Sequence, residues 1–122
     1  MKNNLIVLVV DDQPGMRQLL GSVVMETGHQ VYLAENGLEA VEVVRKVRPQ
    51  VVIMDVKMPV MDGLEALGEI KTIAPETEVI MMTAYISEEV KKAVAEKGAR
   101  CCLAKPFEID MVKSILSSHS KN

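Results

Sequence analysis

The chain has 122 residues, 48% of them hydrophobic and 25% charged, which predicts one folded domain and excludes extensive intrinsic disorder. With 17 acidic against 14 basic residues and only 2% aromatic residues, direct binding to nucleic acid is not expected. No apolar run reaches the roughly 20 residues that span a membrane, so we predict no membrane segment and a cytoplasmic location. We expect a single domain over residues 1–122, with a core at about 4–118 and a tail at 119–122.

Five short apolar runs are predicted to form β-strands. The first run, LIVLVV, is apolar throughout, as expected for a strand buried on both faces of a sheet. The next three are rich in Val, Ile, Leu and Met, and the fifth contains the two cysteines. In chain order, the predicted strands are Leu5–Val10, Val31–Ala34, Val51–Met54, Val79–Met82 and Arg100–Ala104.

Segments with helical periodicity separate these runs. In the first segment, apolar residues recur along one helical face, and Gly28 is expected to end the helix. Ser87, followed by two glutamates, is a capping signal for the fourth helix, which Gly98 is expected to end. The apolar face of the first helix consists of Met16, Leu19, Leu20, Val23 and Val24, and the later helices are predicted at about Leu38–Val47, Leu64–Ile73, Ser87–Gly98 and Ile109–Ser117.

The alternation of strands and helices predicts an α/β fold with a doubly wound, five-stranded parallel sheet and five helices, because parallel strands need helical crossovers. We expect the flavodoxin-like strand order 2-1-3-4-5, in which the third strand is central. Ligands of such sheets bind outside the carboxyl ends of the strands. The residues that follow the strands are therefore the candidate site residues.

Candidate site residues follow four of the five predicted strands, whereas the second strand is followed by Glu35 and Asn36, which would lie at the periphery of the sheet. Asp11 and Asp12 follow the first, Asp55 the third, Thr83 the fourth and Lys105 the fifth. Three carboxylates at one edge repel one another unless a cation or a proton lies among them, and oxygen ligands favour Mg²⁺. A lysine and a hydroxyl suit the oxygens of a phosphoryl group, so Asp55 is the candidate nucleophile that would form an acyl phosphate.

Each of these residues has a simpler explanation when it is considered alone. An aspartate after a strand is commonly a helix cap or a turn former, and a lone lysine is commonly a solvated surface charge. The combination favours a site. Cys101 and Cys102 are adjacent in a strand and point to opposite faces, so we expect packed, reduced thiols.

Four segments together resemble the receiver domain of two-component response regulators. They are VLVVDDQ, VVIMDVKMPVMDG, IMMTAY and CLAKPF, and the resemblance covers residues 4–118. It implies that Asp55 is phosphorylated by a phosphohistidine on a partner histidine kinase or histidine phosphotransferase. It also implies that Asp12, Asp55 and the Lys57 carbonyl bind Mg²⁺, with Asp11 acting through water. Thr83 and Lys105 would then bind the phosphoryl oxygens.

Two further features follow from the same resemblance. Tyr85 would move when Thr83 is drawn inward, and the Lys105–Pro106 bond would be cis. A partner protein carrying a histidine on a helix is expected to dock on an apolar patch beside the acids. The predicted partner surface consists of Gln13, Pro14, Gly15, Met16, Leu19, Pro106 and Phe107.

The expected protein is a monomeric, stand-alone regulator in a phosphorelay, not an enzyme beyond slow phosphorylation and dephosphorylation of itself. One alternative is a regulator that binds a target protein when phosphorylated, and another is a phosphatase with an aspartyl nucleophile. A flavodoxin-like FMN protein shares the fold, but Asp11 and Asp12 would repel its phosphate. An interaction module with a vestigial pocket is the last alternative.

Overall fold

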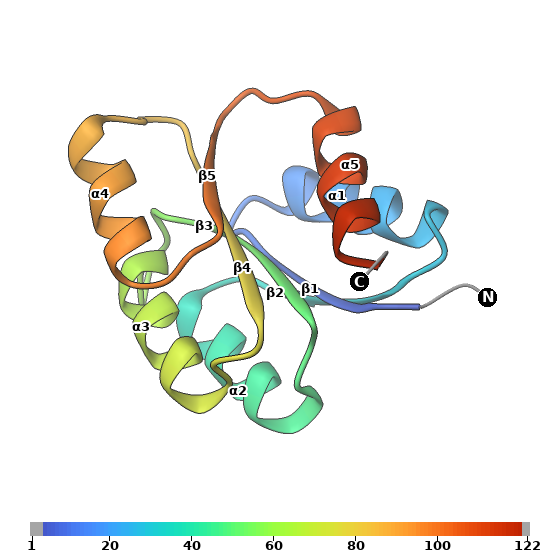
Figure 1. Ribbon diagram of the computed structural model, residues 1–122, viewed down its shortest axis with the longest axis horizontal. Coiled ribbons are helices and arrows are strands. Elements are labelled where there is room, and N and C mark those ends of the chain that lie inside the picture. Colours follow the sequence, from blue (N-terminus) through green and yellow to red (C-terminus); the bar gives the residue numbers. More distant parts are fainter. Residues whose placement is uncertain (1–3, 121–122) are drawn as a thin grey trace.

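The computed structural model describes residues 4–120, and the side chains as far as His119. Five parallel strands form one sheet in the order β2-β1-β3-β4-β5, which confirms the predicted α/β fold and strand order. Helices α1 and α5 cover one face of the sheet, and α2, α3 and α4 cover the other (Figure 1). The strands are β1 (Ile6–Val10), β2 (Gln30–Ala34), β3 (Val51–Asp55), β4 (Glu78–Thr83) and β5 (Cys101–Ala104). The helices are α1 (Pro14–Glu26), α2 (Gly37–Val47), α3 (Gly63–Ile73), α4 (Glu88–Glu96) and α5 (Ile109–Ser120).

The sheet separates two hydrophobic cores, and the central strands supply side chains to both. In β3, Val52 and Met54 pack in the core under α2 and α3, whereas Val51 and Ile53 pack in the core under α1 and α5. Successive side chains of a strand point to opposite faces, so a strand that is buried on both faces is apolar at every position. Burial on both faces explains why the first four residues of β3 are all apolar, and the strand ends at a buried polar residue, Asp55.

The predicted helices are all present, with ends that differ by a few residues from the predicted ones. Asn36, Asp62 and Ser87 cap α2, α3 and α4, and each side-chain oxygen accepts a hydrogen bond from the backbone N–H three residues later. Helix α5 continues to Ser120, beyond its predicted end at Ser117. Residues 121–122 of the predicted tail lie outside the described residues. Among residues 4–120, no helix is long and apolar enough to cross a membrane.

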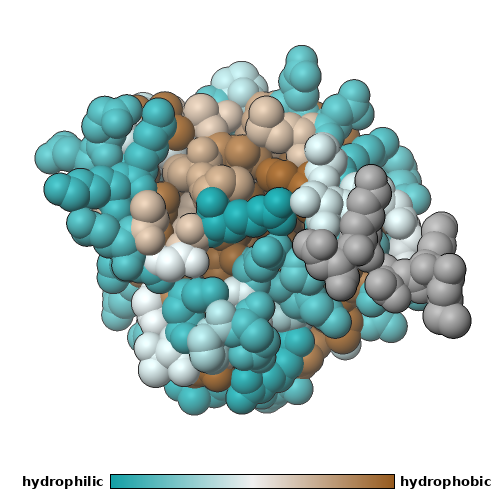
Figure 2. Space-filling view, viewed as in Figure 1, coloured by the Kyte–Doolittle hydropathy of each residue, from teal (hydrophilic) through white to brown (hydrophobic). Residues whose placement is uncertain are grey.

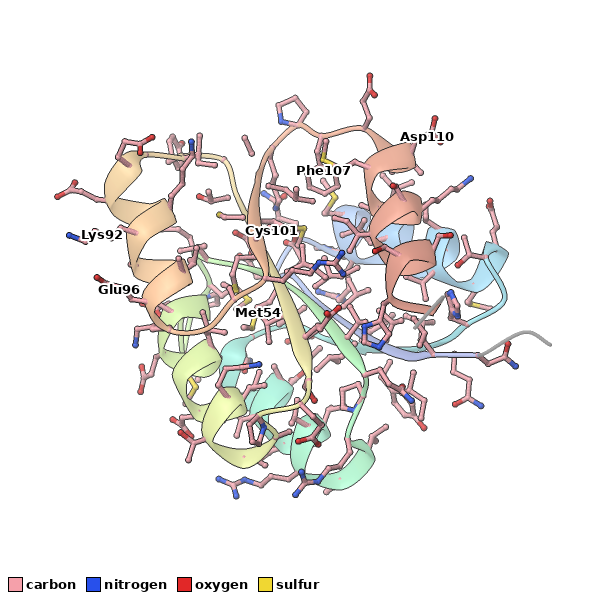
Figure 3. All side chains as sticks on the ribbon, in the orientation of Figure 1. Met54, Lys92, Glu96, Cys101, Phe107 and Asp110 are labelled. Carbon is pink, nitrogen blue, oxygen red and sulfur yellow. The ribbon has the colours of Figure 1, made fainter. Side chains whose placement is uncertain are left out.

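The two cysteines pack on opposite faces of β5, as predicted. Both are free thiols; Cys101 contacts the core under α1 and α5, and Cys102 contacts the core on the other face. Figure 3 shows Cys101 at the strand and Phe107 in the segment between β5 and α5. Burial, the largest effect on each thiol, raises the pKa of both Cys101 and Cys102.

Candidate functional site

Three carboxylates meet at the carboxyl edge of the sheet. Asp11 and Asp12 follow β1, and Asp55 is the last residue of β3, the neighbouring strand. One oxygen atom from each carboxylate lies within 4.8 Å of the others. Asp11 is fully buried, Asp55 is 8% exposed and Asp12 is exposed. The cluster therefore combines two buried acids with one that faces solvent.

Asp11 is fixed at its backbone and at its side chain. Its N–H donates to the carbonyl oxygen of Ala34 at 3.1 Å, and its Oδ1 accepts from the N–H of Gln13 at 2.9 Å. Its Oδ2 lies 2.8 Å from Nζ of Lys105. These contacts hold the carboxylate toward the centre of the edge.

Lys105 bridges the two buried acids. Its Nζ lies 2.8 Å from Oδ2 of Asp11 and 2.9 Å from Oδ2 of Asp55, and its side chain is only 12% exposed. Burial of the ammonium lowers the pKa of Lys105, but hydrogen bonds to both carboxylates and their charges outweigh burial, so the net pKa is raised. The lysine is therefore a charged group, and its peptide bond to Pro106 is cis, as expected.

Asp55 lies where β3 meets the start of α3. Its Oδ1 accepts a hydrogen bond from the N–H of Lys57 at 3.3 Å. A β-carbon at Gly63 would overlap the carbonyl oxygen of Asp55, so only glycine allows α3 to begin this close to the strand end. The N–H of Gly63 donates to the carbonyl of Val56 at 2.7 Å, which fixes the same junction.

Thr83 ends β4, the strand beside Asp55, and is 1% exposed. Its hydroxyl oxygen accepts a hydrogen bond from the N–H of Tyr85 at 3.1 Å. The side chain of Tyr85 is 76% exposed. Thr83 and Tyr85 are thus connected directly, as a coupled movement of the two residues requires.

The donor set fits a hard divalent cation. The clustered atoms are carboxylate oxygens, and three carboxylates against the single ammonium of Lys105 leave excess negative charge. Oxygen ligands with excess negative charge are what Mg²⁺ prefers.

The predicted partner surface is accessible, although two of its residues are half-buried. Gln13, Pro14, Gly15 and Pro106 are exposed, and Leu19 is 48% exposed. Met16 and Phe107 are the half-buried pair, and both pack against the core under α1 and α5.

The sequence interpretation missed Arg17, the third residue after Pro14 in α1. Its Nη1 donates to the carbonyl oxygen of Asp11 at 2.7 Å. A basic residue in α1, five residues after Asp12, was the available signal, but nothing in the sequence shows that the side chain turns back to the main chain.

A model of the response regulator receiver domain family matches residues 7–117 of the chain. The chain belongs to this family. Sporulation initiation phosphotransferase F of Bacillus subtilis is 42% identical to this receiver domain over 113 residues, covering 93% of this chain and 91% of that protein. Chemotaxis protein CheY of Listeria monocytogenes is 39% identical over 116 residues, covering 94% of this chain and 98% of that protein.

A solved structure adds a similarity in three dimensions. The CheX–CheY–BeF3–Mg²⁺ complex of Borrelia burgdorferi contains a chain that matches this receiver domain with a TM-score of 0.87 and 29% identity, covering 93% of this chain and 87% of that chain. Family and fold therefore agree with the resemblance found in the four sequence segments. The roles of individual site residues remain predictions.

Proposed function

We propose that this receiver domain accepts a phosphoryl group on Asp55 from the phosphohistidine of a histidine kinase or histidine phosphotransferase, and passes it on in a phosphorelay. The observation that carries the proposal is the position of Asp55. Its carboxylate accepts a hydrogen bond from the ammonium of Lys105 and lies beside the acid pair Asp11 and Asp12. The similarity to a sporulation phosphotransferase supports the relay role.

The proposed transfer is a displacement at phosphorus. A carboxylate oxygen of Asp55 forms a bond to phosphorus while the bond between phosphorus and the histidine nitrogen breaks. The leaving imidazole keeps the electron pair of that bond and takes up a proton from solvent. The product is an acyl phosphate on Asp55.

Lys105 and Thr83 are proposed to bind the transferred group. The ammonium of Lys105 would move from Oδ2 of Asp55 to a phosphoryl oxygen. Thr83 accepts from the N–H of Tyr85, so its own hydroxyl proton is available for a second phosphoryl oxygen. A shift of Thr83 toward the phosphoryl group would act on Tyr85, which makes this pair the proposed switch.

The proposed cation is Mg²⁺, bound by the Asp12 and Asp55 carboxylates and the Lys57 carbonyl, with Asp11 acting through water. When bound, it would neutralise charge on the phosphoryl oxygens. Support comes from the clustered oxygens and from the similar CheY structure, which is described as containing BeF3 and Mg²⁺.

The proposal describes a monomeric, stand-alone receiver domain over residues 1–122 in the cytoplasm. Two relatives that suggest such a role are themselves matched over 91% and 98% of their own lengths. Two free thiols agree with a reducing compartment. The protein would turn over no external substrate, and sustained hydrolysis of free phosphate esters would favour the phosphatase alternative instead.

The test is phosphate incorporation from phosphoramidate, a small donor with a phosphorus–nitrogen bond, in the presence of Mg²⁺. Intact-mass measurement is expected to show one phosphate on the unsubstituted chain and none on Asp55→Asn. Asp110→Asn, which changes an exposed acid of α5, is the matched control and should incorporate normally. Incorporation into Asp55→Asn would refute the assignment.

Docking of a histidine-bearing helix on the predicted partner surface has its own test. Leu19→Ala should slow transfer from a phosphorylated protein donor and leave phosphoramidate labelling unchanged, because Leu19 is exposed on α1. Leu38→Ala, with similar exposure on α2, is the control. Equal slowing in both assays would contradict a docking role.

Binding of a target protein is the second candidate function. Tyr85 and Ile86, between β4 and α4, and Met111, on α5, expose large hydrophobic side chains. Figure 2 shows apolar surface between α4 and α5, flanked by hydrophilic surface over α4. The similarity to a chemotaxis CheY protein favours the same candidate. A target that binds the phosphorylated chain without removing its phosphate would support this function over a relay.

A further inference from the structure

The contact between Arg17 and the main chain of Asp11 has no role in the proposed transfer. Nη1 of Arg17 donates to the carbonyl oxygen of Asp11 at 2.7 Å, one of the shortest side-chain contacts at this edge of the sheet. Arg17 is half-buried in the first turns of α1, and its own N–H donates to the carbonyl of Gln13 at 3.0 Å. The helix therefore holds the Arg17 guanidinium in place against the acidic loop that follows β1.

The carbonyl that Arg17 holds belongs to the peptide that joins Asp11 to Asp12. Because a peptide unit is planar, fixing its oxygen also fixes the direction in which the chain enters Asp12. The next peptide is held as well, since the N–H of Gln13 donates to Oδ1 of Asp11. Asp12 is thus positioned through both of its peptide bonds, one held by Asp11 and the other by Arg17.

The two acids differ in how far they depend on this support. The Asp11 carboxylate is fixed directly by Gln13 and Lys105. The Asp12 carboxylate is exposed, and within residues 4–120 it has no hydrogen bond or ion pair. Its direction toward the other carboxylates depends on the backbone. A support that acts on this backbone therefore acts on Asp12 more than on Asp11.

We propose that Arg17 is a positioning residue for the cation site, which fixes the Asp11–Asp12 peptide and thereby aims the Asp12 carboxylate at the ion. The inference rests on the proposed function, because Asp12 is there a direct ligand. Mg²⁺ demands near-ideal octahedral geometry, so a ligand with a freely turning backbone binds it less well. The positive charge of Arg17 acts in the opposite direction, because it repels a cation. The two effects predict changes of opposite sign when Arg17 is replaced.

The test is calorimetric titration of the unsubstituted chain, Arg17→Met and Arg45→Met with Mg²⁺ at constant ionic strength. Arg45 is exposed on α2, so Arg45→Met removes one positive charge from a helix away from the acidic loop. Arg17→Met should bind Mg²⁺ about tenfold more weakly, as expected for loss of one charge-assisted hydrogen bond. Arg45→Met should stay within about twofold of the unsubstituted chain.

Two further measurements separate positioning from a general effect on the fold. Phosphoramidate labelling of Arg17→Met should need more Mg²⁺ for its half-maximal rate but reach nearly the same rate at saturation. Arg17→Lys keeps the charge and one donor, so it should recover part of the lost affinity. If Arg17→Met fails to fold, the comparison of Arg17→Lys with the unsubstituted chain carries the test, with an expected loss of about threefold.

Equal Mg²⁺ affinity of Arg17→Met and Arg45→Met would overturn the inference, and so would tighter binding by Arg17→Met, because charge repulsion would then dominate. Both results leave the proposed function intact, since labelling of Asp55 is measured separately. An unsubstituted chain that binds no Mg²⁺ would overturn the inference and the proposed cation site together.

Discussion

The two edges of the sheet each carry an ionic cluster in which one residue bridges two partners. At the carboxyl edge, Lys105 lies between Asp11 and Asp55, and the lysine side chain is 12% exposed. At the amino edge, Glu78 at the start of β4 accepts from Arg100 at 2.9 Å and lies 2.7 Å from Nδ1 of His119. In both clusters one charged residue contacts two partners. The central residue is basic at the carboxyl edge and acidic at the amino edge, and the carboxyl-edge side chains are more deeply buried.

The difference distinguishes a site from a structural contact. The amino-edge side chains are between 22% and 36% exposed, and the central acid has basic partners on both sides. Such pairs stabilise a surface weakly. The carboxyl edge buries its charges and adds Asp12, so negative charge is in excess. Buried, unbalanced charge costs stability, which is expected where a cation and a phosphoryl group are to bind.

The largest expected effect is at the carboxyl edge. Lys105→Met would leave Asp11 and Asp55 without their shared ammonium, and loss of one partner from a buried ion pair should lower the free energy of unfolding by about 3 kcal/mol. Urea denaturation without Mg²⁺ measures this change. Added Mg²⁺ should restore part of it. A change below about 1 kcal/mol would show that the carboxyl edge behaves like an exposed surface.

A second comparison concerns the two non-glycine residues that have a positive φ in the part of the chain that the structure describes. Val60, in the loop after β3, has φ 69° and is 78% exposed, whereas Arg48, after α2, has φ 55° and donates to the carbonyl of Ile73. A β-branched residue is strained in this region, so Val60→Gly should raise the free energy of unfolding by about 1 kcal/mol. Arg48→Gly should gain less, because it also loses a contact.

Thermal or urea unfolding of the two glycine variants measures this difference. A destabilised Val60→Gly would mean that the valine side chain contributes a contact that outweighs the strain of its backbone. A larger gain in Arg48→Gly than in Val60→Gly would reverse the expected ranking of the two positions.

At the amino edge, Arg100→Met is expected to cost no more than about 1 kcal/mol, because Arg100 and Glu78 are both about one-third exposed. Urea denaturation under the conditions used for Lys105→Met gives a direct comparison. A loss as large as that of Lys105→Met would remove the energetic distinction between the two edges.

The smallest expected effect is a pH dependence of the amino-edge cluster. Burial raises the pKa of Glu78, but the hydrogen bond and charge of His119, followed by those of Arg100, outweigh it and lower the pKa below 4.5. A depressed carboxyl pKa stabilises the fold above the unfolded value, and the contribution is lost as the pH falls through the folded value. The difference in unfolding free energy between the unsubstituted chain and Glu78→Gln should therefore shrink from about pH 5.5 to about pH 3.5. A difference that grows on acidification would contradict this assignment.

The fold and the membership of the carboxyl-edge cluster could be predicted because both depend on local patterns. A strand buried on both faces must be apolar, so the first polar residue marks its end, and parallel topology brings these ends to one edge. Asp11, Asp55 and Lys105 were found in this way, although they are far apart in the sequence.

Contacts that depend on how a long side chain folds back could not be predicted. Arg17 was unnoticed because its partner is a carbonyl, which every residue carries. The pairing of His119 with Glu78 joins the last turns of α5 to the amino edge of the sheet, the edge opposite the candidate site. This pairing has no local signature in the sequence. Val60 has a positive φ although valine disfavours it, so propensity alone pointed away from that conformation.

The adjacent cysteines of β5 supply a native pair of chemical reporters, one for each layer of helices. Cys101 lies against the layer formed by α1 and α5, and Cys102 against the layer formed by α2, α3 and α4. Both thiols are half-buried and burial raises the pKa of each, so an alkylating reagent should modify each cysteine faster when its own layer opens. Peptide mapping after timed alkylation would therefore measure local opening of the two helical layers separately, without introducing a new cysteine.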